Sequence, residues 1–296
     1  MEMKTNDLKV IEYNLENNYY IVLFENSIGK LLMMSGAIFE YIQKYSNIYF
    51  INKNLNIFSN LELKGYSPEE FKFLNINQSN IISINIMDYD KFLKDGWNVS
   101  TIYNYIFNEK FEYIPPKIIL SDEEKRTANQ FKSSLNSNKK ILIIHPFAST
   151  CTSGNYDPYK KSFRDYFTKD LINRYKDDYT ILQIHNKNQH HFDNTISLSN
   201  KTLREIVSII SISDKIISCD TLTPHISAGL NIKSLVLWSI TNEKLYGHPI
   251  HINFREKELN EYIQLESNIQ KIPKIPPIIN MFTEKTLSII EEYLNE

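Results

Sequence analysis

Residues 218–230 read Ser-Cys-Asp-Thr-Leu-Thr-Pro-His-Ile-Ser-Ala-Gly-Leu, and this stretch joins a predicted strand to a predicted helix. The apolar pair at 216–217 indicates that a short buried strand ends just before it. Thr223 is a suitable N-cap, Pro224 fits the first helical turn, and Asn231 can end the helix in the left-handed conformation. The polar residues of the stretch are therefore expected between the carboxyl end of a strand and the start of a helix.

Such a junction is where open parallel sheets bind phosphate, because free backbone N–H groups and the helix dipole both point at the ligand. Thr221, Thr223 and His225 add hydroxyl and imidazole groups to this junction. A well-capped helix without any ligand would use the same hydroxyls, so both interpretations stay open here. Asp220 is better suited to fixing the turn, by accepting backbone N–H groups, than to acting as a base.

The rest of the second half repeats the pattern of a short apolar run followed by a helical segment. Strands are predicted at 141–144, 179–184 and 196–198, and the capping box at 202–205 opens a helix. The first half holds a strand–helix–strand unit at residues 19–51. Strands that alternate with helices in this way predict an α/β fold with parallel sheets.

Length and composition limit the class of protein. The chain has 296 residues, enough for two domains, and its 42% hydrophobic content and net charge of −2 are typical of a soluble globular protein. The near-zero charge argues against a strongly electrostatic nucleic-acid binder, although a local basic groove stays open. Two cysteines predict no disulfide framework and a reducing, cytoplasmic location. We find no signal-peptide core and no apolar run of about 18 residues, so any membrane contact would be peripheral.

The segment Asp-Thr-Leu-Thr-Pro-His-Ile-Ser-Ala at 220–228 resembles the Asp-Ser/Thr-Gly-x-x-His-x-Ala-Ala signature of glycosyltransferase family nine, the heptosyltransferases. The resemblance extends through 200–206 and 235–241, and it is strongest over 141–241 and weak over 19–51. It implies the GT-B fold, in which two Rossmann-like domains face each other across a cleft.

The same resemblance implies that the chain divides into two domains and a C-terminal helix. Residues 1–135 would form the N-terminal acceptor-side domain, and 136–280 the C-terminal nucleotide-sugar-binding domain, with the boundary at the polar run 133–140. Residues 281–296 would form a C-terminal helix that packs back on the first domain.

The function implied is transfer of a sugar from a nucleotide-diphosphate donor to an acceptor hydroxyl, with a nucleotide sugar and a saccharide or other acceptor as partners. Two alternatives stay open. One is a transferase that acts on another polymer, either protein or modified DNA. The other is a catalytically silent nucleotide-sugar-binding protein.

By this resemblance the signature turn holds the donor diphosphate. Lys161 matches the lysine of a Lys-x-Trp element, with Phe163 in place of tryptophan, and a cation there would face the phosphate charges as the leaving group forms. The residues implied for the diphosphate are Lys161, Ser149, Thr150, Asp220, Thr221, Thr223 and His225, and those implied for the nucleoside are Arg204 and Glu205.

Two positions depart from the family pattern. The catalytic aspartate corresponds to Lys30, and the signature glycine corresponds to Leu222, whose side chain is expected to displace the phosphate or tilt the turn. An attacking hydroxyl needs a base, and a protonated lysine cannot serve as one. Three interpretations stay open for the catalytic position: Glu25 or another nearby carboxylate is the base, Lys30 binds an anionic group, or transfer activity has been lost.

A metal site is not expected. His185, His190, His191 and Asp193 lie close together, but their spacing fits no standard zinc pattern. The acidic pair at 177–178 is typical of a turn between a helix and a strand. We therefore expect neither a metal nor another cofactor.

Overall fold

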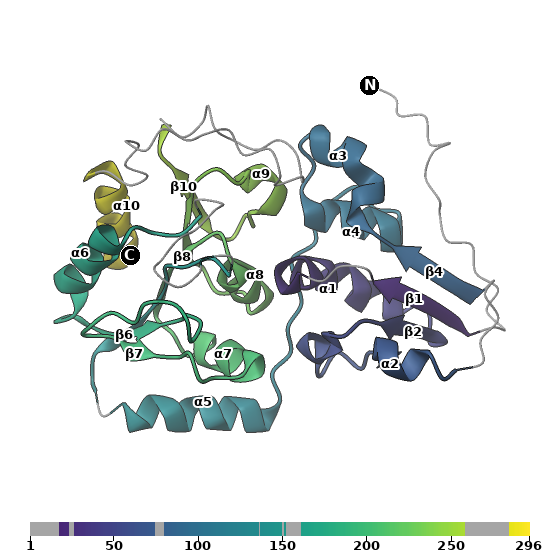
Figure 1. The fold of residues 1–296 in the computed structure, drawn as a ribbon, viewed down its shortest axis with the longest axis horizontal. Helices are drawn as coiled ribbons and strands as arrows, with labels where there is room; N and C mark the ends of the chain where they lie inside the picture. Colours follow the sequence, from purple (N-terminus) through teal and green to yellow (C-terminus); the bar gives the residue numbers. More distant parts are fainter. Residues whose placement is uncertain are drawn as a thin grey trace.

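The computed structural model describes residues 18–23, 27–74, 80–135, 137–149, 151, 161–257 and 284–296. Within them the chain forms two parallel sheets that lie side by side, each with its own helices (Figure 1). The expected α/β class with two parallel sheets is confirmed.

The first sheet has four strands in the order β3-β2-β1-β4. The strands are β1 (Tyr19–Leu23), β2 (Ile48–Ile51), β3 (Gly65–Tyr66) and β4 (Ile81–Ile84). The helical segments of this half are α1 (Ile28–Ile42), η2 (Leu55–Phe58), α2 (Pro68–Phe71), η4 (Ile86–Tyr89), α3 (Asp90–Lys94) and α4 (Val99–Asn108). The predicted strand–helix–strand unit is confirmed as β1, α1 and β2, and α1 packs against α4.

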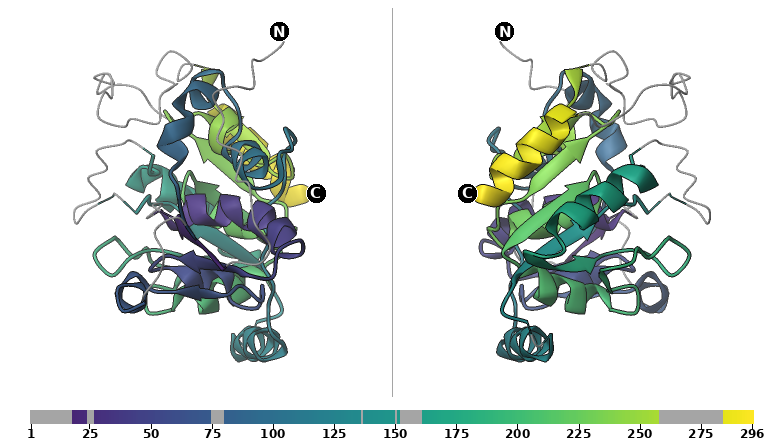
Figure 2. Two further views of the ribbon diagram at one scale, coloured as in Figure 1. Left: turned by 90° about the vertical axis from the view of Figure 1, so that its right-hand side faces the viewer. Right: turned by 90° about the vertical axis from the view of Figure 1, so that its left-hand side faces the viewer.

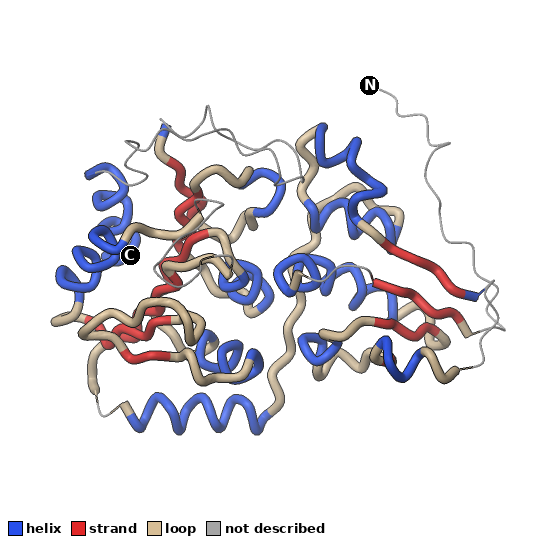
Figure 3. The backbone as a smooth tube through the Cα atoms, viewed as in Figure 1, coloured by secondary structure: helices blue, strands red, loops and turns tan. Residues whose placement is uncertain are grey.

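The second sheet has six strands in the order β10-β9-β8-β5-β6-β7. The strands are β5 (Lys140–His145), β6 (Tyr179–Gln183), β7 (Ile196–Ser197), β8 (Lys215–Cys219), β9 (Leu235–Trp238) and β10 (Ile252–Arg255). Its helices are α5 (Asp122–Ser134), α6 (Asp165–Tyr175), α7 (Leu203–Ile210), α8 (Leu222–Gly229), α9 (Glu243–Tyr246) and α10 (Glu284–Asn295). Figure 3 shows the helices in blue around the red strands of both sheets.

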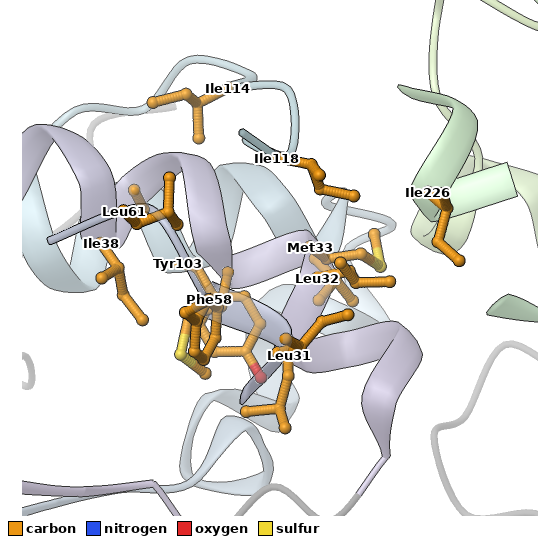
Figure 4. Close-up of a cluster of buried hydrophobic side chains, with 14 of the residues drawn as sticks. Leu31, Leu32, Met33, Ile38, Phe58, Leu61, Tyr103, Ile114, Ile118 and Ile226 are labelled. Carbon is orange, nitrogen blue, oxygen red and sulfur yellow. The ribbon is translucent and has the colours of Figure 1, made fainter. Parts of the chain in front are cut away.

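A single apolar cluster extends from the first sheet into the second. It includes Leu32 and Met33 of α1, Ile118 of the connecting segment and Ile226 of α8 (Figure 4). The segment 114–118 passes close to both helices, and its backbone leaves no space for a side chain at Gly36 of α1. A Cβ on Gly36 would lie 2.0 Å from the Pro115 carbonyl oxygen, and one on Gly229 would lie 2.8 Å from the Ile118 side chain. The two halves are therefore joined by apolar packing around this segment.

Two helices lie in places that the sequence did not predict. The predicted first domain included α5, but α5 packs against α7 and runs beneath the second half of the molecule (Figure 1). A bidentate pair between Arg204 of α7 and Glu124 of α5 fixes it there, with an Nε–Oε1 distance of 2.6 Å. The boundary at 133–140 therefore lies beyond a helix that already belongs with the second sheet, and the segment before Ser121 is the better candidate.

The C-terminal helix α10 was expected on the first domain, and this expectation is wrong. Its buried side chains Ile290, Tyr293 and Leu294 belong to the apolar cluster under the second sheet. The Tyr293 hydroxyl accepts a hydrogen bond from the Ile216 backbone N–H of β8, and Lys215 donates to the Tyr293 carbonyl. The side views show α10, in yellow, on the outer face of the second sheet (Figure 2).

No helix in the described parts of the chain is both long and apolar enough to span a membrane.

Candidate functional site

The candidate site lies at the carboxyl edge of the second sheet, between β5 and β8. The chain adds strands on one side of β5 up to β7 and then on the other side from β8 onward. β5 is flanked by β6 on one side and by β8 on the other, so the connections leave β5 and β8 toward opposite ends of the sheet. Ligands of open α/β sheets bind outside the carboxyl ends of strands at such a reversal. α8 begins here, directly after β8.

The helix starts earlier than the sequence predicted. Thr221, not Thr223, is the N-cap, and its side chain makes no capping hydrogen bond. The Thr223 hydroxyl is instead buried and lies 2.7 Å from His145 Nδ1 at the end of β5. Pro224 stays within the first turn, where its missing N–H leaves no helical bond unmade. Asn231 has φ 58°, which confirms the predicted left-handed ending.

Asp220 and Lys161 form an ion pair next to the start of α8. Lys161 Nζ lies 2.6 Å from Asp220 Oδ2, and the two side chains are 21% and 8% exposed. Burial alone would raise the pKa of Asp220, but the Lys161 ammonium outweighs burial and the pKa is lowered. Two of the residues predicted for the donor site thus lie together, with Asp220 binding the Lys161 ammonium.

His225 begins a chain of buried polar groups. Its Nδ1 lies 2.7 Å from His248 Nε2, and His248 Nδ1 lies 2.9 Å from the Tyr113 hydroxyl. Burial lowers the pKa of His225 to about 4 and lowers that of His248 well below its usual value, so both rings are neutral at pH 7. The neutral His225 therefore offers a hydrogen bond rather than a charge.

The other ring nitrogen of His225 faces the first sheet. A Cβ placed on Gly29 would lie 3.2 Å from His225 Nε2, so the first turn of α1 comes directly against the first turn of α8. Lys30 follows in α1 and is half-buried. The structure therefore brings the turn of Lys30 close to the start of α8, and a catalytic or binding role for this lysine stays a prediction. Glu25 lies outside the described residues.

Leu222, at the position that corresponds to the signature glycine, packs against neighbouring apolar side chains. Its side chain is partly buried against the apolar cluster that joins the two halves. This packing gives the side chain a place in the contact between α1 and α8, which are neighbours in the fold.

The remaining predicted residues take three different places. Ser149 is exposed in the loop after β5, and Thr150 lies outside the described residues. The Arg204 guanidinium donates to Glu124 and to the Ile119 carbonyl, at 2.8 Å from its Nη2 to each. Glu205 accepts the Thr202 backbone N–H in a capping box. These contacts occupy Arg204 Nε and Nη2 and the Glu205 carboxylate, whereas Arg204 Nη1 is buried without a hydrogen-bond partner among the described residues. A role in nucleoside binding stays a prediction.

The sequence analysis missed Arg255 and Glu243. Arg255 is the last residue of β10, its side chain is 4% exposed, and it forms an ion pair with Glu243 of α9. Its Nη2 also donates to the Thr241 carbonyl. The only sequence signal was the alternating run at 252–255, which is too short to be distinguished from a loop.

The histidine-rich loop after β6 is held by local hydrogen bonds. His185 Nε2 lies 2.7 Å from the Ser197 hydroxyl, and His191 Nε2 lies 3.1 Å from the Thr195 carbonyl oxygen. In the part of the chain that the structure describes, no group of three or more His, Cys, Asp or Glu side chains could hold a metal ion.

No protein-family model matches the chain, and no curated protein matches it. The chain is similar to several solved structures of glycosyltransferases. The iron-containing dodecameric glycosyltransferase TibC from enterotoxigenic E. coli H10407 is 10% identical, with a TM-score of 0.69, and the match covers 97% of this chain and 77% of that one. A family 9 glycosyl transferase from Veillonella parvula DSM 2008 is 10% identical, with a TM-score of 0.61 and coverage of 83% and 86%. The E. coli ADP-heptose LPS heptosyltransferase II is 15% identical, with a TM-score of 0.58 and coverage of 80% and 90%.

TibC has also been solved in complex with ADP-D-β-D-heptose. At identities of 10–15% these likenesses concern the fold. They extend over most of the chain and include both sheets. The chain therefore has the GT-B fold that the signature at 220–228 implied.

Proposed function

We propose that the chain transfers a sugar from a nucleoside-diphosphate donor to an acceptor hydroxyl. The observation that carries this proposal is the Lys161–Asp220 pair at the start of α8, 2.6 Å between Nζ and Oδ2, at the strand reversal of a GT-B fold. A phosphate at this position would meet the free N–H groups of α8 and an ammonium already held in place.

Glycosyl transfer involves two bond changes and one proton transfer at this site. The bond between the anomeric carbon and the donor phosphate breaks, a bond to the acceptor oxygen forms, and a base takes the acceptor proton. Lys161 and the α8 N-terminus would offset the charge that builds up on the departing diphosphate. His225, neutral and directed across to Gly29, would add a hydrogen bond between the two helices.

The base is the part of the site that differs from the family pattern. The first turn of α1 contains no acidic residue, and Lys30 stands where the family has its aspartate. We propose that a carboxylate outside that turn accepts the proton, with Glu25 the first candidate, and that Lys30 binds an anionic group. We also propose that transfer needs no metal, since a lysine, a helix N-terminus and a histidine are available to the phosphates.

A direct test is calorimetric titration with ADP, UDP and GDP. Wild-type protein should bind at least one of them, and Lys161→Ala should weaken that binding by about 1.5–3 kcal/mol, the range for a hydrogen bond to a charged group. Lys125→Ala is the matched control, because Lys125 pairs with Asp122 on the exposed surface of α5 and should leave affinity unchanged. Equal affinity in wild type and Lys161→Ala would remove the site.

Donor hydrolysis without an acceptor separates this proposal from the silent binder. A transferase should release free nucleoside diphosphate slowly from a nucleotide sugar, whereas a silent binder should release none. The same assay with a chelator, and then with added manganese or iron, tests whether turnover is metal-independent.

A further inference from the structure

Arg255 carries buried hydrogen-bond donors that no described residue satisfies. Within the described residues its Nε and Nη1 atoms are buried and have no hydrogen-bond partner, although Nη2 is bound to Glu243 and Thr241. Ser239, just after β9, has a buried hydroxyl in the same condition. An unsatisfied buried donor destabilises the fold, and more so when it is charged. Thr241 Oγ1 and Glu243 Oε2 are likewise buried without a hydrogen-bond partner among the described residues, apart from the Arg255–Glu243 ion pair. Several such atoms at one edge of one sheet therefore indicate a missing partner.

These atoms lie at the same sheet edge as the proposed phosphate site. Arg255 pairs with Trp238 of β9, and Leu237 of β9 pairs with Cys219 of β8, so the carboxyl ends of the three strands are in line. Two strand spacings, about 10 Å, separate β10 from β8. The Asp220 carboxylate also acts on the Arg255 guanidinium and offsets part of the lowering of its pKa by burial.

The charges of this edge balance. Lys161 pairs with Asp220, and Arg255 pairs with Glu243, so two cations face two carboxylates. A second phosphate next to Arg255 would add negative charge beside Glu243, which is unfavourable at short range. A neutral polyol would add no charge beside Glu243. Its hydroxyls can accept hydrogen bonds from a guanidinium and donate them to a carboxylate.

We propose, building on the proposed function, that Arg255 and Glu243 form the subsite for the hydroxyl groups of the transferred sugar, with Ser239 as a third contact. The donor would lie along the carboxyl edge of the sheet, with its diphosphate at the α8 N-terminus and its sugar toward β9 and β10. Arg255 Nε and Nη1 donate to sugar oxygens, and Glu243 accepts from a sugar hydroxyl. The Arg255–Glu243 pair then selects the sugar, while Lys161 and α8 bind the diphosphate.

The test compares each nucleotide sugar with its own nucleoside diphosphate. Calorimetry is run with ADP and ADP-D-β-D-heptose, UDP and UDP-glucose, and GDP and GDP-mannose, on wild type, Arg255→Gln and Glu243→Gln. Both variants should bind the accepted nucleotide sugar about tenfold more weakly, as expected for one lost charge-assisted hydrogen bond. Both should bind the free nucleoside diphosphate within about twofold of wild type, since the diphosphate contacts remain.

Arg174→Gln is the matched control, because Arg174 pairs with Asp170 at 2.8 Å on the surface of α6 and is 52% exposed. Thermal unfolding of every variant checks that the fold is retained. The subsite is overturned if Arg255→Gln weakens nucleoside diphosphate and nucleotide sugar equally, because Arg255 then binds phosphate. It is also overturned if neither variant changes the binding of any nucleotide sugar, or if wild type binds a diphosphate but none of the three sugars. Wild type that binds no nucleoside diphosphate would instead remove the proposed function.

Discussion

Two helices, α1 and α8, begin at the carboxyl ends of β1 and β8 and meet at their first turns. The polar and charged side chains at the two helix starts differ. The α8 start has Asp220 bound to Lys161, and its His225 is bound to His248. The α1 start has Lys30 and no acidic residue. The α8 start thus has two buried polar pairs, Lys161–Asp220 and His225–His248, whereas the first turn of α1 has a lysine and no acidic residue.

The two halves of the chain also differ in how they should respond to acid. All seven histidines of the sequence follow residue 144. Burial lowers the pKa of His145 to about 3 and that of His225 and His251 to about 4. His251 accepts the Ser234 N–H on Nδ1, so its proton is on Nε2, which donates to the Pro224 carbonyl. A second proton on Nδ1 of His251 would break the hydrogen bond from the Ser234 N–H.

The largest predicted effect is therefore acid destabilisation of the second half. Below the unfolded pKa of about 6.5, the unfolded chain binds protons that the folded chain does not, so stability falls with pH from about 6.5 to about 4. Each fully buried histidine contributes about 3 kcal/mol over that range, at about 1.4 kcal/mol per pH unit. Urea unfolding at several pH values, followed by the fluorescence of Trp238 in a Trp97→Phe background, measures the slope.

Two variants sharpen this prediction. His251→Asn should reduce the dependence of unfolding free energy on pH by up to one proton, and His190→Asn, at an exposed position, is the matched control. A slope that His251→Asn does not alter would mean that this ring is not held neutral by the fold.

The second prediction concerns the segment that joins the halves. Gly36→Ala should destabilise the protein by about 3 kcal/mol, because the new Cβ would lie 2.0 Å from a backbone oxygen that cannot move alone. Gly229→Ala should cost less than about 1 kcal/mol, since its Cβ meets the movable Ile118 side chain and alanine favours the helix. Thermal unfolding compares them, and equal costs would contradict the close packing at Pro115.

Much of this architecture follows from local sequence signals. The capping box at Thr202 forms as predicted, with both reciprocal hydrogen bonds, and the strand–helix–strand unit spans the predicted residues 19–51. Such features depend on residues within one turn or on period-two burial, which a single sequence displays. The signature at 220–228 likewise located the helix start at the sheet edge to within two residues.

The failures have a common cause, which is that they depend on long-range packing. The sequences of α5 and α10 do not indicate which sheet each helix packs against, because an apolar stripe can pack on any apolar surface. The Arg204–Glu124 pair, which joins α7 to α5, was not predicted either, because the two residues are 80 positions apart. Arg255 was missed because its importance lies in a pair with Glu243 and in its unsatisfied donors, which only the fold shows.

A third prediction separates the two roles considered for Arg204. Its hydrogen bonds hold the pKa of Glu124 at about 2, so Arg204→Gln leaves a half-buried carboxylate without its cation and should lower stability by about 2 kcal/mol. Nucleoside-diphosphate affinity should not change if the role is to hold α5 on α7. A loss of affinity in a still-folded variant would restore the nucleoside-binding prediction, and calorimetry beside thermal unfolding measures both.

The smallest predicted effect is at the α1 start, and it tests the comparison most directly. If Lys30 binds an anionic group across the contact with α8, Lys30→Ala should weaken donor binding by about 1 kcal/mol or less, clearly below the effect of Lys161→Ala, because the main phosphate contacts stay on α8. Lys44→Ala is the control, since Lys44 lies just beyond the far end of α1 and binds Asn108.

Lys30→Asp then decides what the departure from the family means. If Lys30 is an anion-binding residue, aspartate should weaken donor binding further and should not raise transfer or donor hydrolysis, because it places a negative charge near the phosphates. If a base was simply lost, aspartate should raise donor hydrolysis while affinity changes little. Donor affinity and turnover are measured for wild type, Lys30→Ala and Lys30→Asp between pH 6 and 9. Wild-type turnover that survives Lys30→Ala at full rate would exclude this lysine from both roles and make a carboxylate elsewhere, Glu25 first, the residue to replace.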